Sequence, residues 1–254
     1  MRILRILTVF IILTLSSVFA FAQMTEDQAR TKFSAADELY KKEDFAGAVA
    51  MYEEIRQSGW ENGPLYYNLG NSYVKIKQIG RAVLNYERAK RFIPRDADVL
   101  SNARYAESLI GGGAQGPQMS AWEDFIQRQI DFYTLDELLW IVVGTGILGA
   151  AIFLIGLYGQ WPGRRRFAVL SAFFVVLLIY AGYFYLKLGY QKDLCVMVDS
   201  AEGRYEPLPE ATVYFQLFAG DRVHAVAAQG AWAKIRRSDG RSAWVPQDRL
   251  ERIE

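Results

Sequence analysis

The sequence predicts a multidomain membrane protein with three parts: an all-α helical solenoid, a two-helix transmembrane hairpin and a small all-β barrel. Three observations carry this prediction. A pattern of small and aromatic residues repeats after 34 residues in the first half of the chain, and two long uncharged stretches follow it. Region 193–254 then changes to short strand-like runs that are separated by glycine-containing turns.

The composition excludes several classes of protein. The chain has 254 residues, with 29 Lys and Arg against 28 Asp and Glu, so its net charge is +1. This balance argues against a nucleic-acid binder, which usually carries a basic stripe. The single cysteine excludes an intrachain disulfide, and the single histidine excludes a multi-histidine metal site. We therefore expect no metal and no other cofactor.

The first 22 residues have the three parts of a secretory signal peptide. Arg2 and Arg5 form a positive n-region, and Ile6 to Leu15 form a short apolar h-region. Ala20-Phe21-Ala22 has the small residues that signal peptidase requires. We expect cleavage after Ala22 and export of the region beyond it; an uncleaved signal anchor is the alternative.

Region 23–110 contains the repeat, with copies at 29–62 and 63–96 and a capping helix over 97–110. The second copy resembles the tetratricopeptide repeat. The residues that carry this resemblance are Leu69, Gly70, Tyr73, Ala82, Tyr86, Ala89 and Pro94. Two repeats and a cap are near the lower limit for a stable solenoid, so we expect homo-oligomerisation or docking on another domain to add stability.

The resemblance also implies a concave groove that binds protein partners. The groove residues would be Phe33, Asp37, Tyr67, Asn68, Asn71, Lys75, Asn102 and Tyr105. Asparagine and tyrosine side chains both donate and accept hydrogen bonds, as an extended peptide requires; a merely solvated helix face is the alternative. Only Asn68 matches the carboxylate clamp of chaperone-binding tetratricopeptide proteins, which disfavours a chaperone-tail receptor.

A linker and juxtamembrane helix are expected over 111–133, before the two transmembrane helices at 134–160 and 167–187. No charged residue occurs from Leu138 to Gly163 or from Phe167 to Leu186, and each of these stretches is long enough to cross a hydrocarbon core of about 30 Å. The connecting turn, 161–166, contains the basic residues Arg164, Arg165 and Arg166, which mark it as cytoplasmic. Both polar regions would then lie on the outer side of the membrane, in agreement with the signal peptide.

Region 193–254 looks like a bacterial SH3-like domain, a small five-stranded barrel. The resemblance rests on Gly220, Val223, Gly230, Trp232, Gly240, Trp244, Val245 and Leu250. We expect Trp232 and Trp244 to be core residues, with a position at the edge of a binding groove as the alternative. The acidic, proline-containing region 198–212 is predicted to be a long loop, and Cys195 and His224 are predicted to be structural.

The order of these segments resembles the BatE family, associated with Bacteroides aerotolerance. The resemblance implies a non-catalytic scaffold in the bacterial inner membrane, with periplasmic polar regions, that acts with von Willebrand factor A-type membrane proteins and a MoxR-type ATPase. The alternative is an envelope anchor that binds peptidoglycan and recruits a wall enzyme. A catalyst has little support, because the sequence contains no phosphate loop, zinc motif or credible Ser–His or Cys–His pair.

Overall fold

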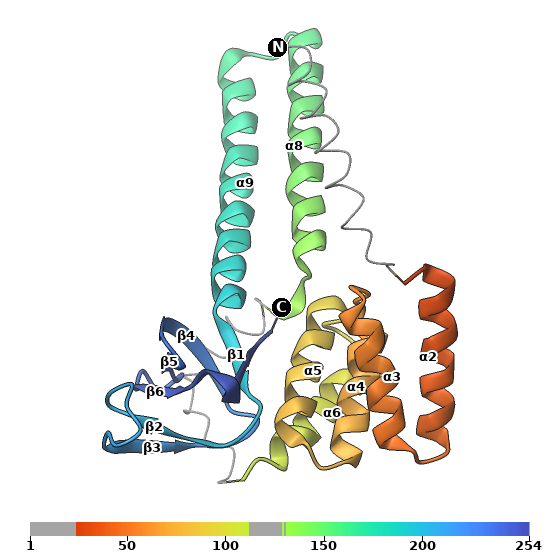
Figure 1. Cartoon of the computed structure of the whole chain (residues 1–254). Coiled ribbons are helices and arrows are strands. Elements are labelled where there is room, and N and C mark those ends of the chain that lie inside the picture. The colour runs from red at the N-terminus through yellow and green to blue at the C-terminus, as the bar shows by residue number, and fades with distance from the viewer. Residues whose placement is uncertain (1–23, 112–128, 130, 254) are drawn as a thin grey trace, which may run out of the picture.

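The computed structural model describes residues 24–111, 129 and 131–253 (Figure 1). This part of the chain contains seven α-helices and a seven-stranded antiparallel sheet. The predicted signal peptide with its cleavage site after Ala22, and most of the predicted linker and juxtamembrane helix at 111–133, lie outside the described residues. Figure 1 shows two long helices that form a stem, with a layer of shorter helices and the sheet both at one end of it.

The helical layer consists of five helices that run alternately toward and away from the stem (Figure 1). They are α2 (Glu26–Lys41), α3 (Phe45–Gln57), α4 (Gly63–Lys75), α5 (Ile79–Phe92) and α6 (Ala97–Ser108). Four of them begin at a residue whose side chain accepts a hydrogen bond from the first turn, namely Thr25, Asp44, Asn62 and Asp96. These caps satisfy backbone N–H groups that the helices leave unpaired, and they fix where each helix starts.

Tyrosines and small residues pack the helical layer. Tyr52, Tyr66 and Tyr86 are all buried almost completely. Helix α5 approaches α4 closely at Gly70, where an added Cβ would lie only 2.6 Å from the Tyr86 ring. A larger residue at position 70 would therefore force this ring, and α5 with it, away from α4.

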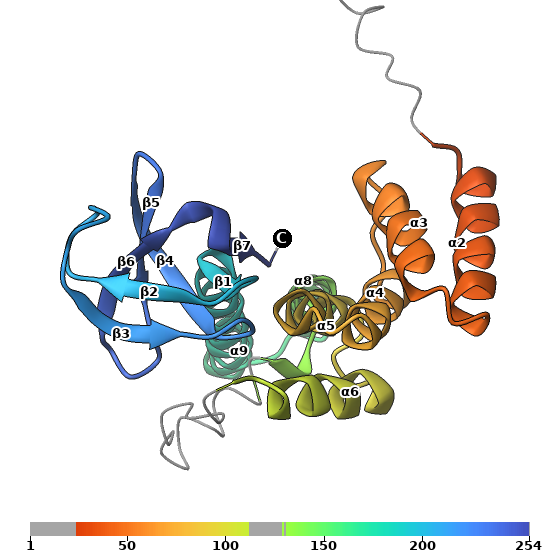
Figure 2. The same cartoon turned by 60° about the horizontal axis from the view of Figure 1, so that its bottom comes forward.

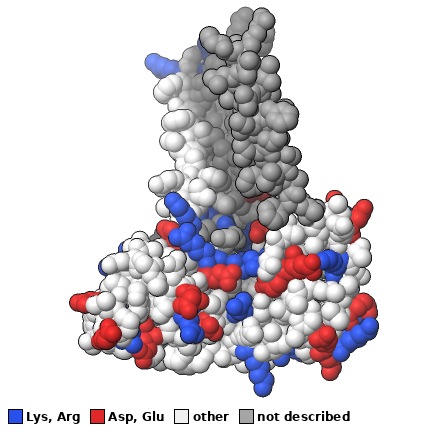
Figure 3. Space-filling model, in the orientation of Figure 1, with Lys and Arg blue, Asp and Glu red and all other residues white. Residues whose placement is uncertain are grey.

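Helices α8 (Leu135–Tyr158) and α9 (Gly163–Lys192) form the stem and pack against each other. Both helices are long and apolar enough to cross a membrane. Their outward side chains are mostly exposed apolar groups, and the charged residues gather at the two ends of the stem and on the base below it (Figure 3). Helix α9 begins at Gly163, so Arg164, Arg165 and Arg166 lie in its first turn and not in the connecting turn.

The seven strands form one antiparallel sheet in the order β3-β2-β6-β5-β4-β1-β7. Their bounds are β1 (Leu194–Met197), β2 (Ala201–Arg204), β3 (Val213–Leu217), β4 (Arg222–Gln229), β5 (Trp232–Arg236), β6 (Ser242–Pro246) and β7 (Leu250–Arg252). Gly220, Gly230 and Gly240, on which part of the SH3-like resemblance rests, all have positive φ, and Gly230 lies in the turn that joins β4 to β5. Strand β2 lies inside the region 198–212 that was predicted to be a loop.

The predicted fold class, a tetratricopeptide solenoid followed by a small SH3-like barrel, is wrong. The sheet is open, with β3 and β7 at its two edges, and it has seven strands where five were expected. The helices do not form a separate solenoid either, because one core cluster includes residues of all five short helices together with Leu194, Val196 and Ile253. Strand periodicity does not reveal closure, which depends on which distant strands pair.

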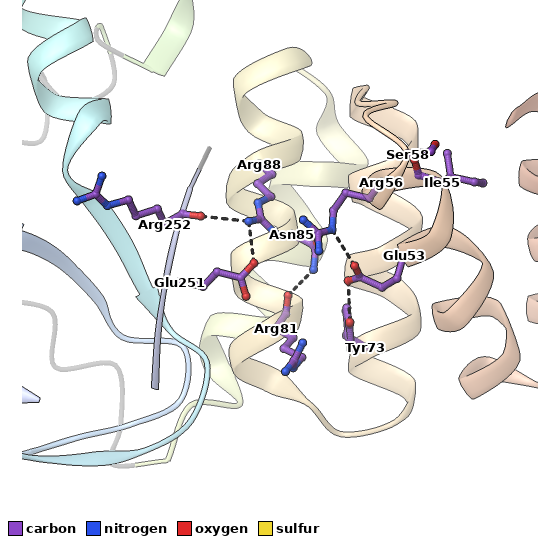
Figure 4. A network of polar contacts seen from close by, with 10 residues as sticks. All are labelled: Glu53, Ile55, Arg56, Ser58, Tyr73, Arg81, Asn85, Arg88, Glu251 and Arg252. Atoms are coloured by element: carbon purple, nitrogen blue, oxygen red, sulfur yellow. Dashed lines mark hydrogen bonds and ion pairs between the residues drawn. The ribbon is translucent and has the colours of Figure 1, made fainter. Parts of the chain in front are cut away.

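Helix α5 joins the helical layer to the sheet. Figure 2 shows α5 and α6 on the side nearest the sheet and α2 on the far side. At the start of α5, a Cβ on Gly80 would lie 2.3 Å from the carbonyl oxygen of Val198, so only glycine permits this approach. Further along, the Arg88 guanidinium, which is 3% exposed, donates to Glu251 Oε1 at 2.9 Å and to the carbonyl oxygen of Arg252 at 3.1 Å (Figure 4).

Glu87 forms the second polar contact between α5 and the sheet. Its carboxylate accepts hydrogen bonds from Lys90 at 2.6 Å and from Arg222 at 2.9 Å. Burial alone would raise the pKa of Glu87, but the two cations outweigh it and hold this pKa below its ordinary value. Arg222 also contacts Glu107 at 3.3 Å, so a single arginine of the sheet contacts both α5 and α6.

Replacement of Glu87 by glutamine should weaken the junction between the helices and the sheet. The variant loses charge-assisted hydrogen bonds to Lys90 and Arg222, which predicts a loss of about 1–3 kcal/mol in the free energy of unfolding. Denaturant unfolding of the full chain in detergent would measure it. The control Glu54→Gln, which removes the exposed ion pair with Lys32, should cost less than about 1 kcal/mol.

The same contact predicts a dependence of stability on pH. Because the folded-state pKa of Glu87 is depressed, its contribution is fully present above the ordinary value of 4.5 and is lost as the pH falls through the folded value. Below pH 4.5, the denaturant concentration at the unfolding midpoint should therefore fall more steeply with decreasing pH for the parent than for Glu87→Gln. Equal slopes for the two proteins would show that Glu87 is not paired as described.

Candidate functional site

An open groove of about 750 Å³ lies on the helical layer, and its walls come from α2, α4, α5 and α6. Five of the eight predicted partner-binding residues line it: Tyr67, Asn71, Lys75, Asn102 and Tyr105. Sequence analysis missed six others: Tyr40, Val74, Lys77, Ile79, Tyr86 and Leu109. We call this surface the amide groove, after the two asparagines on it.

Hydrogen bonds fix the two asparagine side chains. Asn71 Oδ1 accepts from the Tyr86 hydroxyl at 2.7 Å and from Asn102 Nδ2 at 2.9 Å. Asn102 Nδ2 also donates to the Tyr67 hydroxyl oxygen at 3.1 Å. Each amide is therefore held by a side chain of a neighbouring helix. Burial raises the pKa of the Tyr86 phenol, so the phenol keeps the proton that it donates to Asn71.

Each of the two amides keeps one polar group that is not used within the described chain. No described residue bonds Asn71 Nδ2 or Asn102 Oδ1, which leaves one N–H donor and one C=O acceptor on residues that line the groove. One peptide unit carries the complementary pair, a C=O acceptor and an N–H donor. Because their orientation is already fixed, these groups would lose little side-chain entropy when they bind an extended peptide.

The rest of the groove surface is aromatic and cationic. Tyr105 is 57% exposed, and Lys75 and Lys77 lie toward the end where α4 stops. The Lys75 ammonium is 5.7 Å from the centre of the Phe45 ring. No acidic side chain is among the described residues that line the groove, so its chemistry favours a neutral or acidic segment over a basic one.

Phe33, Asp37 and Asn68, the other predicted partner-binding residues, lie elsewhere. Asp37 accepts hydrogen bonds from the Tyr52 hydroxyl and from Asn68 Nδ2, the latter at 2.9 Å. These bonds hold α2, α3 and α4 together. The pKa of the Tyr52 hydroxyl is raised, mainly because the side chain is buried and also because it is bonded to Asp37. Phe33 packs edge-on against Tyr52 and lines a separate hollow of about 320 Å³.

Two equivalent hydrogen-bond networks repeat after 34 residues. Asp37, Tyr52 and Asn68 are bonded to one another as Asn71, Tyr86 and Asn102 are, but only the second set lines the groove. Tyr40 lies one turn beyond Asp37, so an extension of the predicted stripe to the end of α2 would have found it. Tyr86 could not be found in this way, because its ring is in the core and only its hydroxyl reaches the groove.

Cys195 and His224 lie on neighbouring strands but do not form a reactive pair. His224 is the register partner of Leu194, and Cys195 is the partner of Val223, so the two side chains point to opposite faces of the sheet. Burial raises the pKa of the Cys195 thiol and lowers the pKa of His224. In residues 24–111 and 131–253, no group of three or more His, Cys, Asp or Glu could hold a metal ion.

Trp232 and Trp244 are half-buried, and the core cluster of the sheet does not include them. They alternate with the buried residues Ala233, Ile235 and Val245, so they lie on the other face of β5 and β6. The expectation that both are core residues is therefore wrong. The alternative, a position at a binding edge, stays open.

Replacement of Trp244 by alanine should leave the sheet folded, because the side chain lies outside the core. Replacement of Ile235, which is fully buried, should cost about 2–5 kcal/mol in the free energy of unfolding. Near-ultraviolet circular dichroism during denaturant unfolding of each full-length variant would compare the two. A larger loss for Trp244→Ala than for Ile235→Ala would contradict this assignment.

No family model, curated protein or solved structure matches the chain. The resemblance to the BatE family is therefore a hypothesis that rests on the order of segments in the sequence. The geometry of the groove and of the stem is the basis for the function proposed for this chain.

Proposed function

We propose that this chain is a non-catalytic, membrane-anchored scaffold that captures an extended segment of a protein partner in the amide groove. The observation that carries the proposal is the pair Asn71 and Asn102, fixed by Tyr67 and Tyr86, with an unused donor and an unused acceptor among the described residues. Tyr105 would cover apolar groups of the bound segment, and Lys75 would meet an acidic group.

Two features support an anchoring role over catalysis. The single cysteine and the single histidine point to opposite faces of the sheet, so they cannot act together as nucleophile and base. The groove is lined by amides, phenols and lysines, which suit recognition of a chain more than bond cleavage. The BatE-like order of segments implies which partners to seek, namely von Willebrand factor A-type membrane proteins and a MoxR-type ATPase.

The proposed location is the bacterial inner membrane, with α8 and α9 as its two spans. The helical layer and the sheet lie at the same end of the stem (Figure 1), so an inserted hairpin would hold both on one side of the bilayer. Arg164, Arg165 and Arg166 lie at the other end. The preference of basic residues for the cytoplasm supports a periplasmic position for both polar parts.

A reporter that fluoresces only in the cytoplasm tests this topology. Fused after Glu254, it should stay dark, because the C-terminus follows the sheet directly. Replacement of Arg164, Arg165 and Arg166 by glutamine should make part of the population fluoresce, since the positive-inside bias is lost. Full fluorescence of the parent fusion would overturn the proposed orientation.

Substitutions at the rim of the groove test partner capture without disturbing the asparagine network. The double variant Lys75→Glu, Tyr105→Ala changes two exposed side chains of the groove, so it should fold normally. It should lose most of the partner that the parent retains after crosslinking and membrane solubilisation. The matched control is Leu100→Ala, Arg104→Glu, which makes the same charge change on exposed positions of α6 outside the groove.

Retention of the partner by the groove variant, together with its loss from the control, would show that the scaffold binds elsewhere.

A wall-binding anchor is the second candidate, and the exposed Tyr205 and Tyr214 rings favour it because they stack at 4.5 Å and could support a sugar ring. The parent should then cosediment with purified sacculi, and a Tyr205→Ala variant should not. This result, together with an unchanged amount of crosslinked partner in the groove variant, would favour the wall-binding anchor over partner capture in the groove.

A further inference from the structure

The loop between α5 and α6 is bonded to the first turn of the stem. The Arg95 guanidinium forms a two-bond ion pair with the Glu137 carboxylate, one bond of which is 3.2 Å long. It also donates to the carbonyl oxygen of Phe132 at 3.3 Å and lies 5.2 Å from the centre of the Phe132 ring. The loop, Phe132 and the start of α8 are therefore at one height along the stem.

The length of α8 places that height at the boundary of the hydrocarbon core. Its 24 residues extend about 36 Å at about 1.5 Å per residue, slightly more than a core of about 30 Å. The first turn of a centred span, which contains Asp136 and Glu137, then lies among the lipid headgroups. Arg95 must lie there too, because it is bonded to Glu137.

The surface at this height has the composition of a membrane interface. Phe92 at the end of α5 is 41% exposed, and Phe132 is 46% exposed. Phe92 stacks on Tyr66 with 5.8 Å between the ring centres, so its orientation is fixed. Phenylalanine on the apolar face of an interfacial segment is buried at the boundary between headgroups and acyl chains, and arginine there can reach phosphate oxygens while its stem packs on apolar groups.

The sheet is held at the same level by the second helix of the stem. Lys187 of α9 is buried and donates to the carbonyl oxygen of Tyr133, and α9 continues to Lys192, two residues before β1. Neither polar part can move far from the bilayer without breaking these contacts. In an inserted hairpin, the end of the helical layer that carries Phe92 would therefore face the membrane.

We propose that Phe92, Arg95 and Phe132 form a membrane-contact surface that rests in the headgroup layer of a phospholipid bilayer, with both phenylalanine rings at the acyl boundary. This inference rests on the proposed membrane anchoring by α8 and α9. It goes further because it assigns a lipid-binding role to part of the helical layer outside both spans. The contact would fix the tilt of the helical layer, and hence the direction in which the amide groove opens.

Spin labels at single cysteines test the proposal in the full chain, reconstituted in phosphatidylcholine and phosphatidylglycerol nanodiscs. The native Cys195 is buried, and the unsubstituted protein reports its background labelling. The positions are Phe92→Cys, Leu148→Cys in the middle of α8, and Tyr105→Cys near the far end of α6, all on exposed side chains. Collision rates with oxygen and with a water-soluble nickel complex give the depth of each label.

We expect the ratio of oxygen to nickel collisions at position 92 to be severalfold higher than the ratio at position 105. The ratio at position 92 should also be lower than the ratio at position 148. A water-like ratio at position 92 with a lipid-like ratio at position 148 would overturn the membrane-contact surface and leave the anchoring intact. Water-like ratios at both positions would overturn the contact surface and the anchoring together. The two failures are therefore distinguishable.

Discussion

The buried charges of α5 constrain the rest of this structure. Glu87 and Arg88 are consecutive and both buried, and each needs a partner because an unpaired ion in the interior costs several kcal/mol. Arg222 and Glu251, from two different strands of the sheet, supply these partners. These pairs favour the observed docking of the sheet on the helices, since a shift of either element would take Glu251 from Arg88 and leave Glu87 with Lys90 alone.

The same helix turn also organises the groove. Successive residues of a helix point about 100° apart, so Tyr86, Glu87 and Arg88 reach three different surroundings. Tyr86 donates to Asn71 in the amide groove, Glu87 meets Arg222, and Arg88 meets β7. The groove and the junction with the sheet are thus coupled through one rigid element, and a displacement of the sheet would move the hydroxyl that orients Asn71.

Helices with a strong local signal could be predicted from the sequence, whereas pairings between segments far apart in the sequence could not. The helices of the repeat region and the apolar helices of the stem have strong periodic or compositional signals, and the structure has helices over both regions. The edges of the open sheet depend on which strands pair, and β7 stands at one edge because it pairs with β1, more than fifty residues away in the sequence. Arg88 and Glu251 are 163 residues apart, and no pattern in one segment indicates the other.

The candidate site divides in the same way. Asn71 and Asn102 were found because position on a helix was enough to place them on the groove. Asp37 and Asn68 occupy the equivalent positions 34 residues earlier and have equivalent bonds, with Tyr52 in the place of Tyr86, but they do not line the groove. The helical pattern alone could not show which of the two networks the groove would contain. Strand β2 was missed because it is short, mostly polar and contains Gly203, whereas its place in the sheet comes from β3 and β6 on either side.

Helix α9 passes into β1 with only Asp193 between them. The last turn of α9 is braced as well, since the Tyr190 ring lies edge-on to His224 of β4 at 5.2 Å. Helix α9 is therefore connected rigidly to the sheet, without a flexible linker. A rotation of α9 about its axis would turn β1, and the contacts of Glu87 and Arg88 with the sheet would pass that movement to α5, whose Tyr86 orients Asn71.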